Sequence, residues 1–262
     1  MQTILCAIDD SDFAPRILRH AVGVAAALQR RLVVIHVGDV DAADFESRVL
    51  GLLPYGTPYL PELAVRVASG PIADAILSVA DEEDVELIVA GTRARTAVAR
   101  FFLGSVSSAL LQRSGRPVLL VAPGDVDVVT LSPDRARLHL GPVLAAVDLD
   151  ETNATQLAWA SRLASLAHQP LELMTVARDG VSDHDAAAAL RARAQGLGPQ
   201  APDSFMVRRG SVPEEIAHCA RTENAGLIVM GLRDAQRGNP GKVASAVVED
   251  HPALVLAVPA SR

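Results

Sequence analysis

The sequence has few aromatic residues and no excess of basic ones. Only eight aromatics occur among 262 residues, and the formal net charge is −7. Single-stranded nucleic acid is usually bound by aromatic stacking surfaces, and both nucleic acid and anionic membranes attract basic surfaces. We therefore expect no nucleic acid and no membrane among the partners.

Long apolar runs and paired cysteines are also missing. No run approaches the ~20 apolar residues that span a bilayer, and the chain enters a strand at residues 2–5 without a basic and then apolar leader. Cys6 and Cys219 are isolated, which is typical of reduced, buried thiols and not of a disulfide framework or a metal site. These features predict a cytoplasmic globular protein.

The most informative feature present is an internal repeat. Residues 67–93 resemble residues 207–233, so that Gly91 recurs as Gly231, and ILCAIDDSD at 4–12 resembles VLAAVDLDE at 143–151. A self-similar chain of this length is expected to hold two copies of one domain.

The predicted boundaries follow from the repeat. We place domain 1 at residues 1–123 and domain 2 at residues 139–262. The polar stretch between them, residues 124–138, is the expected linker.

Each copy alternates short apolar runs with amphipathic stretches. This order predicts an α/β fold: two tandem copies of a five-stranded, Rossmann-like parallel sheet with helices on both faces. Ser11 or Asp12 is the expected N-cap of the first helix. Strands are expected at 4–8, 32–37, 63–68, 87–90 and 118–121, and again at 143–147, 171–176, 204–208, 227–230 and 254–258. Helices are expected at 12–29, 45–50, 71–83 and 105–112, and again at 153–168, 184–195, 213–223 and 243–249.

The carboxyl ends of the strands are the expected binding edge, because open parallel sheets bind ligands there. Asp9 follows the first strand of copy one, Val37 ends the second, and Gly91 begins the loop after the fourth. We expect Gly91 to let the chain turn sharply near a ligand. Asp9 would suit sugar hydroxyls, and the Val37 backbone would suit the edge of a base.

The loop after the fourth strand has the composition of a phosphate cradle. Gly104 and Ser105 open a helix, whose free N–H groups and dipole attract an anion. Ser107 adds a hydroxyl in the first turn, and three arginines add positive charge: Arg93, Arg95 and Arg100.

A purely structural role is an alternative to a functional role for several of these residues. Asp9 could cap the first helix, and each arginine taken alone could form a solvated loop face. His36 lies in an expected strand and is expected to be packed, not catalytic.

The loop also carries a family resemblance. Gly91-x2-Ala94-x9-Gly104-Ser105 is similar to the ATP-binding signature of the universal stress proteins, G-x2-G-x9-G-[S/T], with one glycine replaced by alanine. Residues 101–105 and 116–121 resemble the family too, and the resemblance covers nearly all of the chain in two copies. Ala94 adds one methyl group, which either weakens binding or is harmless.

The resemblance implies a ligand and its contacts. The ligand is ATP or another adenine nucleotide, which could be accompanied by Mg²⁺. Adenine and ribose would lie near Ala7, Ile8, Asp9 and Val37. The phosphates would lie near Gly91, Ala94, Gly104, Ser105, Val106 and Ser107. Arg93 is a further cofactor-binding candidate because of its positive charge, not because of the resemblance.

Copy two departs from this pattern. Asp148, Val176 and Gly231 match, but Asp234 stands where the second glycine belongs and would repel a triphosphate. Either Gly241 pairs with Gly104 across a shortened loop, so that Lys242 replaces Ser105, or an ungapped pairing puts residues 244–245 there. Both alternatives make copy two a poor nucleotide site.

The leading hypothesis is a stress-response regulatory protein that binds nucleotide in domain 1, with domain 2 as a degenerate structural partner. The alternative is a nucleotide-free interaction scaffold, and a lesser one is a slow ATPase, although no catalytic residues are visible. By resemblance, residues 118–121 and 254–258 would pair the copies as an internal pseudo-dimer. A homodimer and an unknown regulatory protein are further expected partners.

Overall fold

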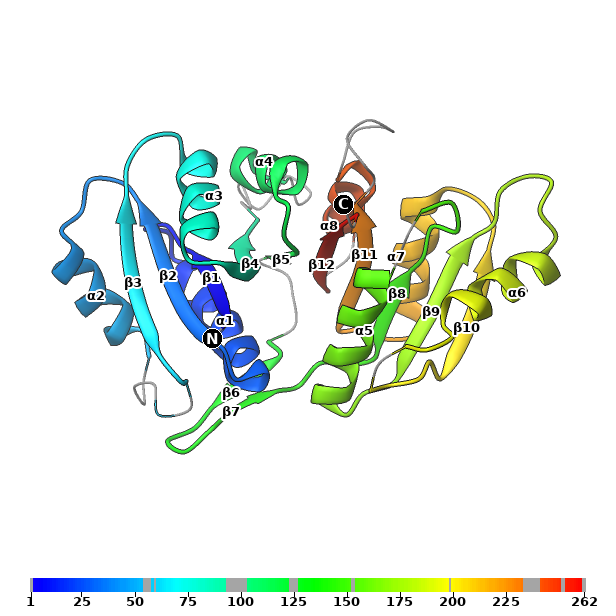
Figure 1. Cartoon of the computed structure of the whole chain (residues 1–262), viewed down its shortest axis with the longest axis horizontal. Helices are drawn as coiled ribbons and strands as arrows, with labels where there is room; N and C mark the ends of the chain where they lie inside the picture. The colour runs from blue at the N-terminus through cyan, green and yellow to red at the C-terminus, as the bar shows by residue number, and fades with distance from the viewer. Residues whose placement is uncertain are drawn as a thin grey trace.

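The computed structural model describes residues 2–53, 58, 60–92, 103–122, 127–151, 154–197, 199–232, 241–250 and 253–260. In the first copy, strands alternate with helices as the sequence predicts (Figure 1). Its elements are β1 (Thr3–Ala7), α1 (Ala14–Leu28), β2 (Arg31–Val37), α2 (Ala42–Gly51), β3 (Leu63–Ala68), α3 (Ile72–Glu82), β4 (Val85–Gly91), α4 (Ser105–Arg113) and β5 (Val118–Val121).

The second copy repeats this order after a two-stranded ribbon of β6 (Val129–Leu131) and β7 (Ala136–Leu138). Its elements are β8 (Val143–Ala146), α5 (Ala154–Ala167), β9 (Leu171–Val176), α6 (Asp183–Arg193), β10 (Ser204–Arg208), α7 (Val212–Thr222), β11 (Leu227–Leu232), α8 (Lys242–Asp250) and β12 (Leu254–Pro259). No helix in the described ranges is both long and apolar enough to cross a membrane.

The two copies share one ten-stranded sheet with the order β10-β9-β8-β11-β12-β5-β4-β1-β2-β3. Pairing within each copy is parallel throughout. The copies meet where β5 and β12 pair antiparallel, with Leu119 opposite Leu256, at the centre of Figure 1. The expected pairing of the last strands is therefore confirmed. Each apolar strand would otherwise be an exposed edge of a five-stranded sheet, which favours its pairing with the other copy.

Two apolar cores lie on opposite faces of this sheet, and each extends through both copies. One contains side chains of α1, α2, α5 and α6. The other contains side chains of α3, α4, α7 and α8. The alternating β and α order thus puts helices on both faces, as a parallel sheet requires.

The repeat is also visible in the backbone. Gln29 and His168, which follow equivalent helices, both have a left-handed conformation, with φ of 54° and 53°. Asp84 and Asn224 have φ of 46° and 52°, again at matched positions. Equivalent helices therefore end in the same way, although the residues that end them differ.

The predicted linker contains the β6–β7 ribbon, which sequence reasoning missed. Val129 of β6 is buried and packs against α1 at Gly23, where an added Cβ would lie 2.4 Å from a Val129 methyl carbon. Gly23 is therefore needed for close packing in the middle of a helix. The boundaries at residues 123 and 139 stay a prediction.

Two further sequence predictions concern single residues. The N-cap of α1 is Phe13, with no side-chain capping hydrogen bond, so the expectation that Ser11 or Asp12 caps this helix is wrong. Cys6 and Cys219 are free and buried, as expected, and burial raises the pKa of each thiol.

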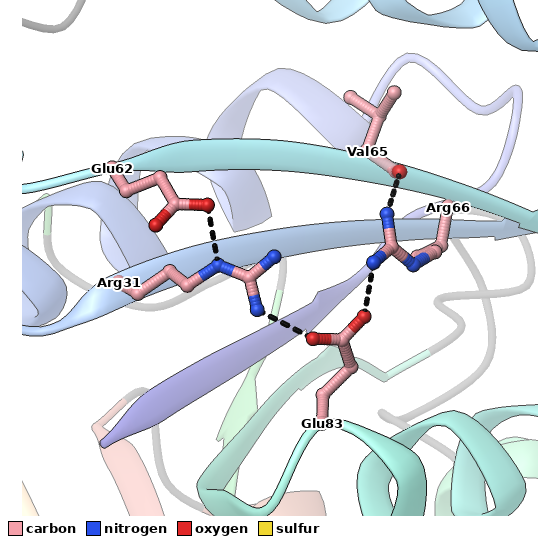
Figure 2. Close-up of polar contacts among 5 residues, drawn as sticks. All are labelled: Arg31, Glu62, Val65, Arg66 and Glu83. Carbon is pink, nitrogen blue, oxygen red and sulfur yellow. Dashed lines mark hydrogen bonds and ion pairs between the residues drawn. The ribbon is translucent and has the colours of Figure 1, made fainter. Parts of the chain in front are cut away.

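An ion-pair network connects β2, β3 and α3 at the outer edge of copy one (Figure 2). Glu83 accepts from Arg31 and pairs with Arg66, and Arg31 also donates to Glu62 at 2.8 Å. The bond from Arg31 is the main reason why the pKa of Glu83 lies below its ordinary value. At the matched positions of copy two, Pro170 and Met206 replace the arginines while Glu223 keeps the carboxylate.

Candidate functional site

A cavity of about 580 Å³ opens at the carboxyl ends of β1 and β4. These two strands are neighbours in the sheet, and the chain proceeds outward from them in opposite directions, so they form its topological switch point. The cavity is lined by every predicted site residue that lies in the described ranges: Ala7, Ile8, Asp9, Val37, Gly91, Gly104, Ser105, Val106 and Ser107.

Asp9 follows β1 and begins a tight local turn. Its Oδ1 accepts from the backbone N–H of Ser11 at 3.1 Å and from the Ser11 hydroxyl at 2.5 Å. Asp148 makes the matching bond to the N–H of Asp150, also at 3.1 Å, so the turn belongs to the repeat. Neither Asp9 bond caps α1. Among the described residues, the hydrogen bonds to Asp9 converge on one oxygen, which leaves Oδ2 available to a ligand hydroxyl.

Gly91 ends β4 directly against α1. An added Cβ would lie 2.3 Å from Ile17 Cδ1 and 3.3 Å from Phe13 Cδ1. Gly91 is not among the glycines with positive φ, so its own backbone conformation does not require glycine. The sharp turn expected near it stays a prediction, because residues 93–102 lie outside the described residues. Close packing against Ile17 is the reason for a glycine here, and Ile17 also lines the cavity.

The start of α4 forms another wall. Gly104 is its N-cap, with φ −67° and ψ 161°, which any residue can adopt, so the fold itself does not require glycine here. Ser105 is exposed, while Ser107 is buried and donates its hydroxyl hydrogen to the Gly91 carbonyl oxygen at 2.8 Å. Ser105 is therefore the hydroxyl free to meet an anion at this helix N-terminus, and Ser107 fixes the helix against β4.

Some of the predicted site cannot be placed, and some of the lining was not predicted. Arg93 and Ala94, with Arg95 and Arg100, lie outside the described residues. Thr92, Ile72 and Ile76 line the cavity without having been predicted. The apolar pair comes from α3, and its signal in the sequence was only the helix period that also predicts core residues. The role of every lining residue toward a ligand stays a prediction.

The matching cavity of copy two is much smaller, at about 160 Å³. The gapped pairing of the loops is the one observed, because Lys242 begins α8 as Ser105 begins α4. The first turns also match, with Ser108 N–H to Gly104 O at 2.9 Å and Ser245 N–H to Gly241 O at 2.7 Å. Arg233 and Asp234 lie outside the described residues.

Side chains also differ between the two cavities. Ala244 stands where copy one has Ser107, so the hydroxyl that holds the helix to the strand end is lost. Gln156 stands where copy one has Ile17, and its amide reaches the backbone of β8 and β11. Copy two has thus kept the backbone of the site and changed its chemistry.

The fold and the switch-point cavity define a tandem α/β protein with two related halves. Residues 1–122 match the universal stress protein family model. The chain is 31% identical to the universal stress protein YxiE of Bacillus subtilis, in an alignment that covers 45% of this chain and 97% of that protein. It is 35% identical to a universal stress protein of Thermus aquaticus, in an alignment that covers 46% of this chain and 98% of the relative. The chain belongs to the universal stress protein family.

A solved structure shows the same tandem arrangement. A universal stress protein from Archaeoglobus fulgidus superposes with a TM-score of 0.73, covering 98% of both chains at 20% identity. Because that identity is low, this likeness bears on the fold alone. The relatives from B. subtilis and T. aquaticus each match about half of the present chain over nearly their full length, as expected for a tandem repeat.

Proposed function

We propose that domain 1 binds ATP or a related adenine nucleotide and that the protein acts as a regulatory module. The observation that carries the proposal is the 580 Å³ cavity at the switch point, which joins Asp9, Val37 and the α4 N-terminus. Its volume lies within the range of small-molecule sites, about 300–1,000 Å³. Membership in the universal stress protein family supports the same assignment.

The lining residues fit such a ligand in named ways. Ser105 and the free N–H groups at the start of α4 would hold the phosphates, and Mg²⁺ could accompany them. The Oδ2 atom of Asp9 would accept from a ribose hydroxyl. The half-buried Val37 and the exposed Ile72 give the cavity apolar surface for the base. Bound nucleotide would bring negative charge and new contacts to the residues that line the cavity. We propose binding, not hydrolysis, as the function.

Regulation would follow from coupling between the ligand and a surface. A nucleotide that binds one conformation of domain 1 more tightly shifts the population toward that conformation, and a protein partner can recognise the change. Domain 2 would then act as the structural partner that covers β5.

A matched pair of substitutions tests this assignment. Ser105 and Lys242 are both exposed first residues of equivalent helices, so leucine at either position should leave the fold intact. We expect Ser105→Leu to weaken ATP binding at least tenfold and Lys242→Leu to leave it unchanged, both measured by titration calorimetry. If both variants bind ATP like the parent chain, the site is not at α4.

A further inference from the structure

The turn that carries Asp9 is exposed to solvent and has little packing of its own. Asp10, Ser11 and Asp12, which follow Asp9 in the chain, are all exposed. The turn is closed locally by the two bonds from Ser11 to Asp9 Oδ1. Exposed segments with few packed side chains are the more mobile parts of a fold. A ligand that uses the Asp9 carboxylate is therefore bound more tightly if a further contact fixes this turn.

Arg48 of α2 provides such a contact. Its Nη2 lies 2.6 Å from Oδ1 of Asp10, the residue directly after Asp9. The next basic group near the Asp10 carboxylate, within the described ranges, is His36 Nδ1 at 3.9 Å, which is too far for a hydrogen bond. Arg48 is thus the ion partner of Asp10, and the pair connects α2 to the turn.

The side chain of Arg48 is itself held in place by α2. Phe45 and Val49 are buried and pack this helix into the core of copy one. Arg48 lies between them in the sequence, and its Cζ lies 5.5 Å from the centre of the Phe45 ring. This cation–π contact restricts the guanidinium before it pairs, so that less conformational freedom is lost in the ion pair. The pair can therefore position the turn although the Arg48 and Asp10 side chains are 45% and 66% exposed.

Copy two anchors the equivalent turn from the equivalent helix. Arg193, in the last turn of α6, donates to the carbonyl oxygen of Leu149 at 2.6 Å and to a second carbonyl of the same turn. Leu149 follows Asp148 as Asp10 follows Asp9. The anchor is therefore repeated, but its chemistry differs. In copy two it uses backbone oxygens, whereas in copy one it depends on a side-chain ion pair.

We propose that Arg48 is a positioning residue for the nucleotide site of domain 1. It fixes Asp10 and thereby aims the neighbouring Asp9 carboxylate at the ribose hydroxyls. The inference rests on the proposed function and names the residue that strengthens the preference of that site for a ribose. Arg48 acts through the turn and not on the nucleotide, because neither Arg48 nor Asp10 belongs to the described lining of the cavity.

ATP and 2′,3′-dideoxy-ATP are the matched probes, because they have the same base and charge and differ only in the ribose hydroxyls. The ratio of their affinities isolates the ribose contact, since a lost charge or a loosened cavity weakens both probes alike. In calorimetry on the full chain, the parent should bind ATP at least about tenfold more tightly, because its hydroxyls bond to a carboxylate. Arg48→Met should lower this preference about two- to fivefold, the range that exposed ion pairs contribute.

Three further variants complete the test. Asp10→Ala should lower the preference by the same factor, and combining it with Arg48→Met should lower it no further, because both changes remove one ion pair. Arg48→Lys keeps the positive charge and should retain most of the preference. Arg19→Met is the control. It removes an ion pair of similar exposure, 2.7 Å to Asp127, outside the described lining of the cavity, and should leave the preference unchanged.

The outcomes separate this inference from the proposed function. If Arg48→Met weakens ATP and dideoxy-ATP by the same factor, or changes neither, Arg48 does not position Asp9. Equal affinity of the parent chain for the two probes would also overturn the inference, while the proposed function stands. No binding of ATP by the parent chain would contradict the proposed function and this inference together.

Discussion

The hydroxyl of Ser107 donates to the carbonyl oxygen of Gly91 at 2.8 Å and so connects the first turn of α4 to the end of β4. Both residues line the domain 1 cavity, and Ser107 is 2% exposed. In copy two the same positions hold Ala244 and Gly231, which cannot make this bond. The bond therefore distinguishes the copy with the larger cavity.

Ser107→Ala should destabilise the chain by about 1 kcal/mol, because it removes the donor of a partly buried carbonyl. It should also weaken ATP binding several-fold, since the α4 N-terminus loses its support. Ser108→Ala, on the neighbouring and more exposed position, is the control. Urea unfolding and calorimetry would measure both effects, and unchanged affinity in Ser107→Ala would show that the bond does not position the site.

Gly91→Ala should cost about 1–3 kcal/mol through overpacking, because its Cβ would lie 2.3 Å from Ile17 Cδ1. Ile17→Val removes that Cδ1 atom, so the double variant should be more stable than the sum of the two single effects predicts. Denaturant unfolding of the four proteins measures the coupling. Strict additivity would contradict the proposed contact.

Glu83→Gln should lower stability at neutral pH by on the order of 1 kcal/mol, a modest value because solvent screens part of the ion pairs. The pKa of Glu83 is lowered in the folded chain, mainly by its bond from Arg31. Its contribution is therefore full above the ordinary glutamate pKa of about 4.3 and is lost as pH falls through the lower folded value. Thermal melts from pH 7 to pH 3 should show the gap between parent and variant closing only in acid. The control is Glu82→Gln, at an exposed position outside the network.

Glu172→Gln should act in the opposite direction. Burial raises the pKa of Glu172, and the charges of Glu223 and Asp203 add to the effect. A raised pKa means that ionised Glu172 destabilises the fold above that pKa, and that the penalty vanishes below about pH 4.3. The variant should be more stable than the parent at pH 7, by no more than about 0.5 kcal/mol because solvent screens much of the penalty, and equal to it near pH 4. A less stable variant at pH 7 would exclude this account.

The strands β3, β5, β9 and β10 have the bounds that the sequence predicts, because each is a short apolar or alternating run between clear turn residues. The β6–β7 ribbon was missed because its strands are only three residues long and carry polar Thr130 and Arg137. Its packing depends on Gly23, more than a hundred residues away in sequence, and periodicity does not report such contacts.

The composition of the domain 1 site was largely predictable, because strand ends and a helix start converge in any parallel sheet of this order. The sequence was less able to show why a particular residue stands at each position. Position 91 holds a glycine because Ile17 packs directly against it, and Ser107 is buried because its hydroxyl bonds to the Gly91 carbonyl oxygen. Both contacts are visible only in the structure. Gln156 was overlooked because a single polar residue within a helix period is normally taken as a surface position.

Titration calorimetry of the intact chain with ATP tests the central claim most directly, after any co-purified nucleotide has been removed. We predict one nucleotide bound per chain, at the larger cavity of domain 1. Two nucleotides per chain would contradict the assignment of domain 2 as degenerate, and no binding at millimolar ATP would contradict the nucleotide site and favour the interaction scaffold.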